Sequence, residues 1–186
     1  GYFWETYQSD DLRLTNGDHD IFTTKYTALG SPLWVRAIRS NHGYGCEVIT
    51  DLSGNILVAA RSGWAFVEDS IVQSDKQSEG LVVCYDKNGN SKWMKIINAA
   101  HMVGYMTGLV FISTKELIVT CYYNQSTLTL DDIVIPEATT GKTSLLIAGL
   151  EIPTTSVNPH KADHSNGSIS IKYNGLNNIS VQYYTT

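Results

Sequence analysis

The sequence lacks the features that mark several large protein classes. Its 186 residues include 13 Lys and Arg against 18 Asp and Glu, for a net charge of −5, and the basic residues form no cluster. A nucleic-acid-binding surface is therefore not expected. No apolar run approaches the roughly 20 residues of a membrane-spanning helix, so membrane insertion is not expected either. Residues 1–5 are neither a signal peptide nor an initiator methionine, which predicts a chain that is processed or incomplete at its front.

Cysteine is also scarce, and its spacing matches no common metal or redox motif. Cys46, Cys84 and Cys121 are far apart, without a C-x-x-C pair or a histidine at zinc-site spacing. Free cysteine is among the most buried residue types, so we interpret all three as residues of core strands. One disulfide with one remaining thiol also fits the count, and the sequence decides neither the pairing nor the redox compartment.

Helical periodicity is almost absent, and short runs rich in Val, Ile, Tyr and Thr recur instead between turn residues. Hydrophobic residues make up 42% of the chain and charged residues 17%, which predicts a packed core. Residues 51–55 and 86–90 contain Asp, Asn and Gly, which tolerate the positive φ of turns between antiparallel strands. The chain is therefore predicted to be all-β. Strands are predicted at 21–26, 47–50, 55–60, 81–85, 93–97, 109–112, 116–122 and 144–148.

The strands belong to an internal repeat. Three pairs recur at one offset, because 85 − 26, 89 − 30 and 93 − 34 are all 59: Tyr26 and Tyr85, Gly30 and Gly89, Trp34 and Trp93. A second match relates the Gly-Tyr steps that end at Tyr44 and Tyr105. An acidic pair precedes a short β run three times, at residues 10–11, 68–69 and 131–132. The repeating unit is therefore about 60 residues long.

Each unit predicts four strands: one opened by Trp, one after Gly-Tyr, one after the turn, and one that ends in Tyr. Four antiparallel strands per repeat are typical of a β-propeller blade, in which each sheet buries its faces against its neighbours. The acidic-pair segment is predicted to be an extra hairpin or long loop between the third and fourth strands. We therefore predict a partial β-propeller of four-stranded antiparallel blades, about two and a half in number.

These motifs in combination resemble the long β-propeller repeat of bacterial surface proteins and giant-virus proteins. The resemblance rests on Gly-Asp-His-Asp-Ile-Phe-Thr-Thr-Lys-Tyr at 17–26, Leu-Trp at 33–34, Gly-Tyr-Gly at 43–45 and Asp-Leu-Ser-Gly-Asn-Ile at 51–56. Gly-Tyr-Phe at 1–3 looks like the end of such a blade. The resemblance covers about residues 1–150 and weakens in the third unit, at 113–116 and 149–151. It implies a structural protein of a bacterial surface or a giant virion.

The predicted organisation has three parts. Residues 1–153 form the propeller repeats, namely a partial blade (1–33), a blade (34–92) and a divergent or terminal blade (93–153). Residues 154–167 are a linker, and 168–186 alternate apolar and polar residues as a C-terminal hairpin with one buried face. A lone hairpin is marginal in water, so we expect it to dock on another sheet. Closed propellers have about four to eight blades, which favours a fragment, an assembly of chains or an open ring.

Few residues are candidates for metal binding, phosphate binding or catalysis. His160 and His164 have metal-ligand spacing, but they lie in an Asn/Ser/Gly/Pro-rich segment that predicts a solvated loop. The acidic pairs are weak calcium ligands, since adjacent strand residues point to opposite faces; we interpret them as protection of sheet edges. Residues 141–143 resemble the end of a phosphate-binding loop but lack its first glycine and its helix. No nucleophile elbow is present, so no catalytic, metal or cofactor residue is predicted.

The aromatic residues divide into two groups. Trp34 and Trp93 occupy equivalent places in two units, which predicts a packing role. The others lie at corresponding outer positions of the units, where they are candidates to anchor a partner, with core packing as the alternative. This second group contains Tyr2, Phe3, Trp4, Trp64, Phe66, Tyr122 and Tyr123.

Repetition without a catalytic constellation predicts a non-enzymatic structural or protein-interaction module, whose expected partners are other protein chains or copies of the same chain. The resemblance implies that this module belongs to a surface or particle assembly, with the extracellular surface or a virion as the expected location. A carbohydrate-binding propeller, with aromatic residues and acidic loops at each sugar site, is the alternative. A hydrolase or lyase on a propeller scaffold is a third hypothesis, and it requires carboxylates that converge near the ring axis.

Overall fold

The computed structural model describes residues 1–40, 42–62, 65–67, 79–99, 103–124, 128–130, 133–135, 143–152, 167–174 and 178–185. Every regular element in these ranges is a β-strand, which confirms the predicted all-β class. The strands are β1 (Tyr2–Ser9), β2 (Leu12–Tyr26), β3 (Pro32–Ser40), β4 (Tyr44–Thr50), β5 (Ile56–Ser62), β6 (Ala65–Val67), β7 (Glu79–Tyr85), β8 (Ser91–Ala99), β9 (Val103–Phe111), β10 (Glu116–Asn124), β11 (Leu128–Leu130), β12 (Ile133–Ile135), β13 (Thr143–Glu151), β14 (Gly167–Asn174) and β15 (Asn178–Thr185).

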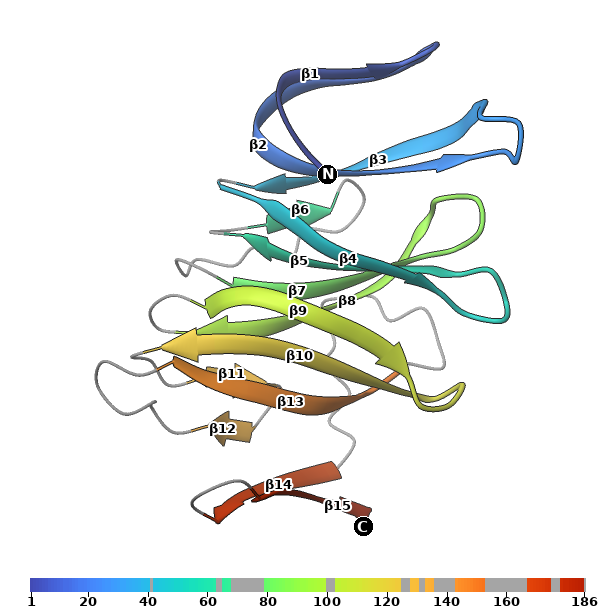
Figure 1. Cartoon of the computed structure of the whole chain (residues 1–186). Coiled ribbons are helices and arrows are strands. Elements are labelled where there is room, and N and C mark those ends of the chain that lie inside the picture. The colour runs from blue at the N-terminus through green and yellow to red at the C-terminus, as the bar shows by residue number, and fades with distance from the viewer. Residues whose placement is uncertain are drawn as a thin grey trace.

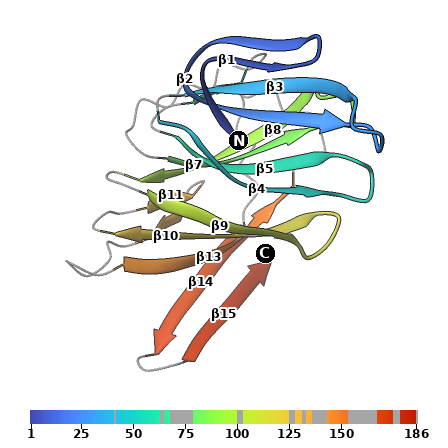
Figure 2. The same ribbon diagram turned by 45° about the horizontal axis from the view of Figure 1, so that its top comes forward.

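All strand pairs are antiparallel, and they form four sheets. Sheet A has the order β1-β2-β3-β6, and sheet B has the order β12-β11-β8-β7-β5-β4. Sheet C has the order β13-β10-β9, and β14 pairs with β15 in sheet D. In Figure 1 sheet A lies at the top, strands β4, β5, β7 and β8 of sheet B lie below it, and sheet C lies below these strands, while β11 and β12 of sheet B lie at the level of sheet C or lower. Figure 2 shows the same sequence from sheet A to sheet C.

Sheet B is buried on both faces, because sheets A and C each cover one of them. The core between sheets A and B contains Ile21, Trp34, Ile38, Ile56, Val58, Ala60, Leu81, Val83 and Tyr85. The core between sheets B and C contains Leu57, Ala59, Val82, Cys84, Trp93, Ile97, Met106, Leu109, Leu117, Val119, Cys121, Tyr123, Leu146, Ala148 and Leu150. Burial on both faces explains why residues 56–60 and 81–85 read as continuous apolar runs instead of alternating ones.

The boundaries of the sheets differ from those of the sequence units by one strand. The predicted units open at Trp34 and Trp93, but the strands that carry these residues close the preceding sheets: β3 pairs with β2, and β8 pairs with β7. The strands β4, β5, β7 and β8 therefore form a consecutive antiparallel meander within sheet B. Sheet A also has four strands, but one of them, β6, comes from the next unit. Sheet C has three strands among the described residues, and sheet B gains two more from the next unit.

Three hairpin turns share one geometry. In each, the amide of the first residue donates to the carbonyl of the fifth: Thr27 to Ser31 at 2.8 Å, Asp51 to Asn55 at 3.0 Å, and Asp86 to Asn90 at 2.8 Å. The fourth residue is a glycine with φ of 88°, 80° and 86° at Gly30, Gly54 and Gly89. Glycine is required because side chains disfavour this left-handed conformation. The turns predicted at 51–55 and 86–90 are confirmed.

The two tryptophans at offset 59 occupy the same place in their hairpins. Trp34 pairs with Lys25, and the register shifts between Lys25 and Tyr26. Trp93 pairs with Cys84, and the register shifts between Cys84 and Tyr85. Each indole is 7% exposed. Their predicted packing role agrees with this burial, since both face the core toward the next sheet.

Two short strands do not join the sheet of the strand that precedes them in the sequence. Each pairs instead with the edge strand of the preceding sheet. β6 follows β5 in sequence but pairs with β3 of sheet A, through Ser40 and Ala65 at one end. β11 follows β10 but pairs with β8 of sheet B, through Ala99 and Leu128 at the same end. These segments are the extra elements predicted between the third and fourth strands of each unit. Their function in the fold is to tie adjacent sheets together by backbone hydrogen bonds.

The C-terminal segment forms the predicted hairpin, β14 with β15, in complete register from Gly167 opposite Thr185 to Asn174 opposite Asn178. In Figure 1 it lies beyond sheet C at the lower end of the molecule. Among the described strands it pairs with no other sheet, and its expected docking on another sheet stays a prediction. The predicted linker lies outside the described residues, apart from Gly167.

Candidate functional site

The outward face of sheet C carries apolar side chains that are exposed or half-buried. We define the open face as Val110, Ile118, Tyr122, Leu145 and Ile147. The alternating residues Leu117, Val119 and Cys121 point into the core, so Ile118 and Tyr122 point away from it. Val110 pairs with Ile118, and Leu145 pairs with Tyr122, which places them on the same face. Val110 is 54% exposed and Leu145 is 58% exposed.

Three residues of the open face, Val110, Ile118 and Ile147, correspond to apolar positions on the face of sheet B that sheet C covers. Cys46 is an extra residue in β4 because Gly45 pairs with Ala60 and Glu47 with Ala59. Thr107 is the matching extra residue in β9, where Met106 pairs with Cys121 and Gly108 with Thr120. The two bulges are 61 residues apart, so β5 and β10 are aligned. In this alignment Ile118 of β10 stands at the position that Leu57 has in β5. Ile147 stands at the position of Val82, because the two residues pair with aligned positions of β10 and β5. Leu57 and Val82 are 1% and 0% exposed.

At the opposite end of the stack, the β1–β2 hairpin curls over its own sheet and covers the outward face of sheet A (Figure 1). Tyr7 contributes stacking and hydrogen bonds to this contact. Its ring stacks on Phe22 with centroids 4.0 Å apart, and its hydroxyl lies 3.0 Å from that of Tyr26 and accepts a 3.1 Å hydrogen bond from Thr24. Burial raises the pKa of Tyr7, while hydrogen bonds from Ser9 and Tyr7 lower the pKa of Tyr26. The buried residues of this cluster are Phe3, Leu14, Val35 and Ala37.

Sheet A holds the turn at 86–90 of sheet B through side-chain donors. The indole nitrogen of Trp34 and the Nζ of Lys25 donate to the carbonyl of Lys87 at 3.1 and 2.9 Å. The Nε of Arg36 donates to the carbonyl of Gly89 at 2.6 Å. A Cβ atom on Gly89 would lie 2.8 Å from the Trp34 ring, so the turn packs directly on the indole. These contacts fix the position of sheet A relative to sheet B.

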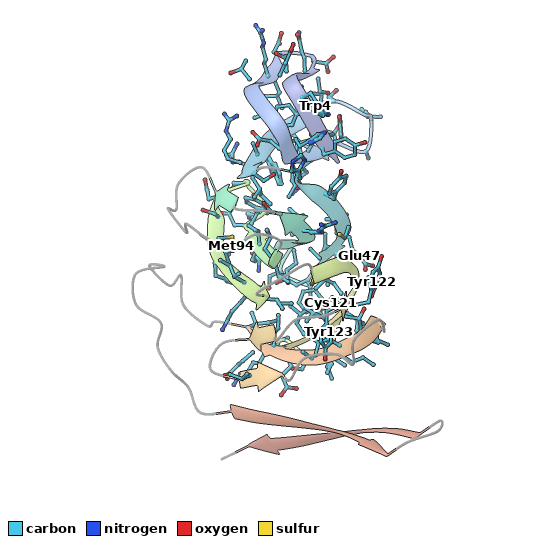
Figure 3. The ribbon with its side chains drawn as sticks, turned by 90° about the vertical axis from the view of Figure 1, so that its left-hand side faces the viewer. Trp4, Glu47, Met94, Cys121, Tyr122 and Tyr123 are labelled. Atoms are coloured by element: carbon cyan, nitrogen blue, oxygen red, sulfur yellow. The ribbon has the colours of Figure 1, made fainter. Side chains whose placement is uncertain are left out.

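Sheets B and C are joined by a carboxylate. Glu47 on β4 accepts a 3.0 Å hydrogen bond from the backbone amide of Leu109 on β9. Figure 3 shows Glu47 between these two strands. A charged acceptor of this kind strengthens the hydrogen bond and satisfies an amide that faces another sheet. The carboxylate is therefore a structural link between the two sheets.

A group of aromatic and histidine side chains surrounds the start of β1. The Nδ1 atoms of His19 and His42 are 3.1 Å apart, and both residues have left-handed backbones with φ of 59° and 55°. The Trp4 ring lies against His19 with centroids 3.6 Å apart, and Tyr2 contacts Tyr44 at 5.4 Å. Trp4 is 57% exposed and Tyr2 is 51% exposed. Left-handed backbones at residues other than glycine are uncommon and concentrate at functional sites.

An ion pair between the buried Asp20 and the partly buried Arg39 supports this group. Asp20 is 2% exposed; it accepts hydrogen bonds from the Ser40 amide at 2.7 Å and from Arg39 at 2.9 Å. The carbonyl of His19 accepts from the Gly43 amide at 2.8 Å and from the Ser40 hydroxyl at 2.9 Å. These bonds hold the His19 backbone in its left-handed conformation.

A shallow groove of about 590 Å³ runs between β2 of sheet A and β4 of sheet B. Tyr7, Phe22 and Tyr26 line one side, and Glu47 and Val48 line the other. Its walls are mainly apolar. The groove opens beside the curled hairpin, so a movement of the hairpin would enlarge it.

The predicted partner-anchoring aromatics do not form one surface. Tyr2 and Trp4 are exposed, Tyr122 lies half-buried on the open face, and Phe3 and Tyr123 are buried in two different cores. Figure 3 shows Trp4 near the top and Tyr122 and Tyr123 on sheet C, far from it. For Phe3 and Tyr123 the core alternative is correct, because each points inward from its strand. The side chains of Trp64 and Phe66 lie outside the described residues.

The other predicted residues are placed as follows. Cys84 and Cys121 are buried and Cys46 is half-buried, and all three are free thiols. Burial raises the pKa of Cys84 and of Cys121 to about 12. Asp10 and Asp11 form the tip of the β1–β2 hairpin, so they are turn residues with no strand edge of their own. Residues 68–69, 131–132, 141–142, 160 and 164 lie outside the described residues.

Sequence reasoning missed the pairing of His19 with His42 and the capping role of Tyr7. The aligned bulges were also missed. A partial signal for the capping role was present, since residues 7–14 alternate around the first acidic pair as residues 128–135 do around the third. The histidine pair joins β2 to the segment between β3 and β4, and no local pattern predicts it.

The described residues contain no group of three or more His, Cys, Asp or Glu side chains arranged to hold a metal ion. Within the same ranges, no helix has the length and apolar character needed to cross a bilayer. Comparisons with protein-family models, with curated proteins and with solved structures find no match for this chain. Functional inference therefore rests on the surfaces described above.

Proposed function

We propose that the chain is a non-enzymatic structural or protein-interaction module of a surface or particle assembly, with propeller-type sheets that stack face to face. The observation that carries this proposal is the open face of sheet C. Val110 and Leu145 are more than half exposed there, and Ile118 and Ile147 stand at the positions of Leu57 and Val82, which sheet C covers in sheet B. Exposed contiguous apolar surface on a folded chain is typical of a protein interface.

The hairpin geometry supports the propeller interpretation. The shared turns, the shared register shifts at Trp34 and Trp93, and the two strands given to a preceding sheet all repeat from one sheet to the next. Sheets related in this way bury one another's faces, and each needs a neighbour. A bacterial surface or a virion is the proposed setting, as the resemblance of the repeat motifs implies.

The test is whether a charge on the open face abolishes association. Sedimentation velocity of the full chain from about 1 to 100 μM should show self-association of the wild type. Leu145→Lys combined with Ile147→Lys should remain monomeric, because two buried ammonium groups without partners oppose docking. Leu52→Lys is the matched control, since Leu52 is 100% exposed in a turn of sheet B. A wild-type chain that stays monomeric throughout this range overturns the proposal.

A carbohydrate-binding function is the second candidate, and the exposed Trp4 and Tyr2 beside the histidine pair favour it. Aromatic faces with nearby polar side chains are a common way to bind the apolar face of a sugar. A glycan array with the wild type and Trp4→Ala tests it. Binding that Trp4→Ala abolishes supports this function, and an array without wild-type binding removes it.

A further inference from the structure

Two histidines from separate segments bring their ring nitrogens together. His19 lies in β2 and His42 lies in the segment between β3 and β4, yet their Nδ1 atoms are 3.1 Å apart. The ring centroids are 5.2 Å apart, and the ring planes make an angle of 49°. His42 is exposed and His19 is half-buried, so the pair is accessible from solvent. A ligand that binds imidazole can therefore reach both rings.

The backbone holds the two histidines close to each other. The carbonyl of His19 accepts a 2.8 Å hydrogen bond from the amide of Gly43, the residue after His42, and a 2.9 Å bond from the Ser40 hydroxyl. A Cβ atom on Gly43 would lie 2.7 Å from that carbonyl oxygen, so the close approach requires glycine. Two side chains on a frame fixed in this way lose little conformational entropy when they bind one ligand together.

The separation of the two nitrogens fits two ligands of one metal ion. Imidazole nitrogens lie about 2.0–2.1 Å from a bound zinc ion, so nitrogens 3.1 Å apart subtend an angle of about 95–102° at the metal. This angle lies between those of neighbouring square-planar ligands, about 90°, and tetrahedral ligands, about 109°. The imidazole that carries the proton of the hydrogen bond coordinates as its Nε2–H tautomer, so both rings bind as neutral ligands.

We propose that His19 and His42 form a two-histidine site for a divalent transition metal, with Cu²⁺ bound most tightly. Imidazole is a good ligand for copper, nickel and zinc, and among these ions Cu²⁺ has the highest affinity for a given nitrogen site. Calcium and magnesium do not fit, because they require oxygen ligands. Among the described residues no third His, Cys, Asp or Glu completes the set, so water fills the remaining positions. The site is independent of the proposed interaction function, because it contains no residue of the open face.

Trp4 supplies a local signal for metal binding. The centroid of its ring lies 3.6 Å from that of His19, and its side chain is 57% exposed. Cu²⁺ quenches the fluorescence of a nearby indole. Binding at the histidine pair should therefore remove the contribution of Trp4 to the fluorescence of the chain, and Trp4→Phe should abolish this part of the quenching.

A titration of the full chain with Cu²⁺, followed by tryptophan fluorescence, tests the site. His19→Asn and His42→Asn should each raise the dissociation constant at least about tenfold, since each removes a ligand. Asparagine tolerates the left-handed backbone at both positions, so the variants keep the local fold. The matched control replaces the other spaced pair, His160→Asn with His164→Asn, and should leave the quenching of Trp4 unchanged. An unchanged dissociation constant in either His19→Asn or His42→Asn overturns the proposal.

Pulsed electron paramagnetic resonance counts the imidazoles that bind Cu²⁺. The full chain with His160→Asn and His164→Asn, loaded with less than one equivalent of Cu²⁺, should show the combination lines of two equivalent imidazoles. His42→Asn in this background should reduce them to the lines of one imidazole. A parent spectrum with a single imidazole, or combination lines that survive His42→Asn, would show that the contact between His19 and His42 is only a hydrogen bond, and the proposal would be wrong.

Discussion

The contact between Gly89 and Trp34 offers the most direct test of how the sheets are held together. Gly89 is in the left-handed region with φ of 86°, and an added Cβ would approach the indole to 2.8 Å. Gly30 is its equivalent in the preceding hairpin, with φ of 88°, but no atom lies within 4 Å of its Cβ position. Gly89→Ala and Gly30→Ala therefore change the same backbone conformation, and only the first disturbs an inter-sheet contact.

The expected magnitudes follow from this difference. A left-handed alanine costs about 1–2 kcal/mol, which is the whole expected loss for Gly30→Ala. Gly89→Ala adds the cost of overpacking against a buried indole, about 1–3 kcal/mol. Its total is therefore about 2–5 kcal/mol. The smaller entropy of an unfolded chain with alanine affects both variants equally, so it does not alter their difference.

Equilibrium unfolding in urea, followed by tryptophan fluorescence and by circular dichroism, measures both losses. We expect Gly89→Ala to lower the free energy of unfolding by about 1–3 kcal/mol more than Gly30→Ala does. Trp34→Phe in the Gly89→Ala background should recover part of the loss, because the smaller ring makes room for the methyl group. Equal losses for the two glycine variants would refute the packing of the turn on Trp34.

Three further predictions concern buried and turn residues. Asp20→Ala should lower the free energy of unfolding in urea by about 2–4 kcal/mol, because it removes the acceptor of the buried Ser40 amide and the carboxylate that pairs with Arg39. Burial acts against ionisation of Asp86, but hydrogen bonds from Asn90, Asn88 and Gly89 prevail and lower its pKa. Its contribution to stability should be present above its ordinary pKa of 3.8 and be lost as the pH falls below it, a loss absent from the acid unfolding of Asp86→Asn. Cys84 and Cys121 should resist a thiol reagent at pH 8 until the chain unfolds, while Cys46 reacts first, as mass spectrometry would show. Because folding raises the pKa of the two buried thiols from 9.0 to about 12, their contribution to stability should decline between these pH values.

The sequence by itself determined the strands, the turns and their recurrence. Short β-branched runs between Asp, Asn and Gly residues identify hairpins, because backbone sterics and turn chemistry act over four or five residues. Burial of Cys84 and Trp93 also followed from local pattern. The propeller interpretation and the structural function stay predictions, supported by the geometry that the hairpins share.

Only the tertiary structure decided which sheet each strand joins. The strand with Trp34 closes the sheet before it, and β6 and β11 cross to a preceding sheet, because hydrogen-bond partners are set by the stacking of whole sheets. The same holds for Tyr7 on Phe22 and for His19 beside His42, which meet across 15 and 23 residues of chain. Local chemistry specifies a hairpin, but the choice between covering its own sheet and joining another depends on which apolar face lies within reach.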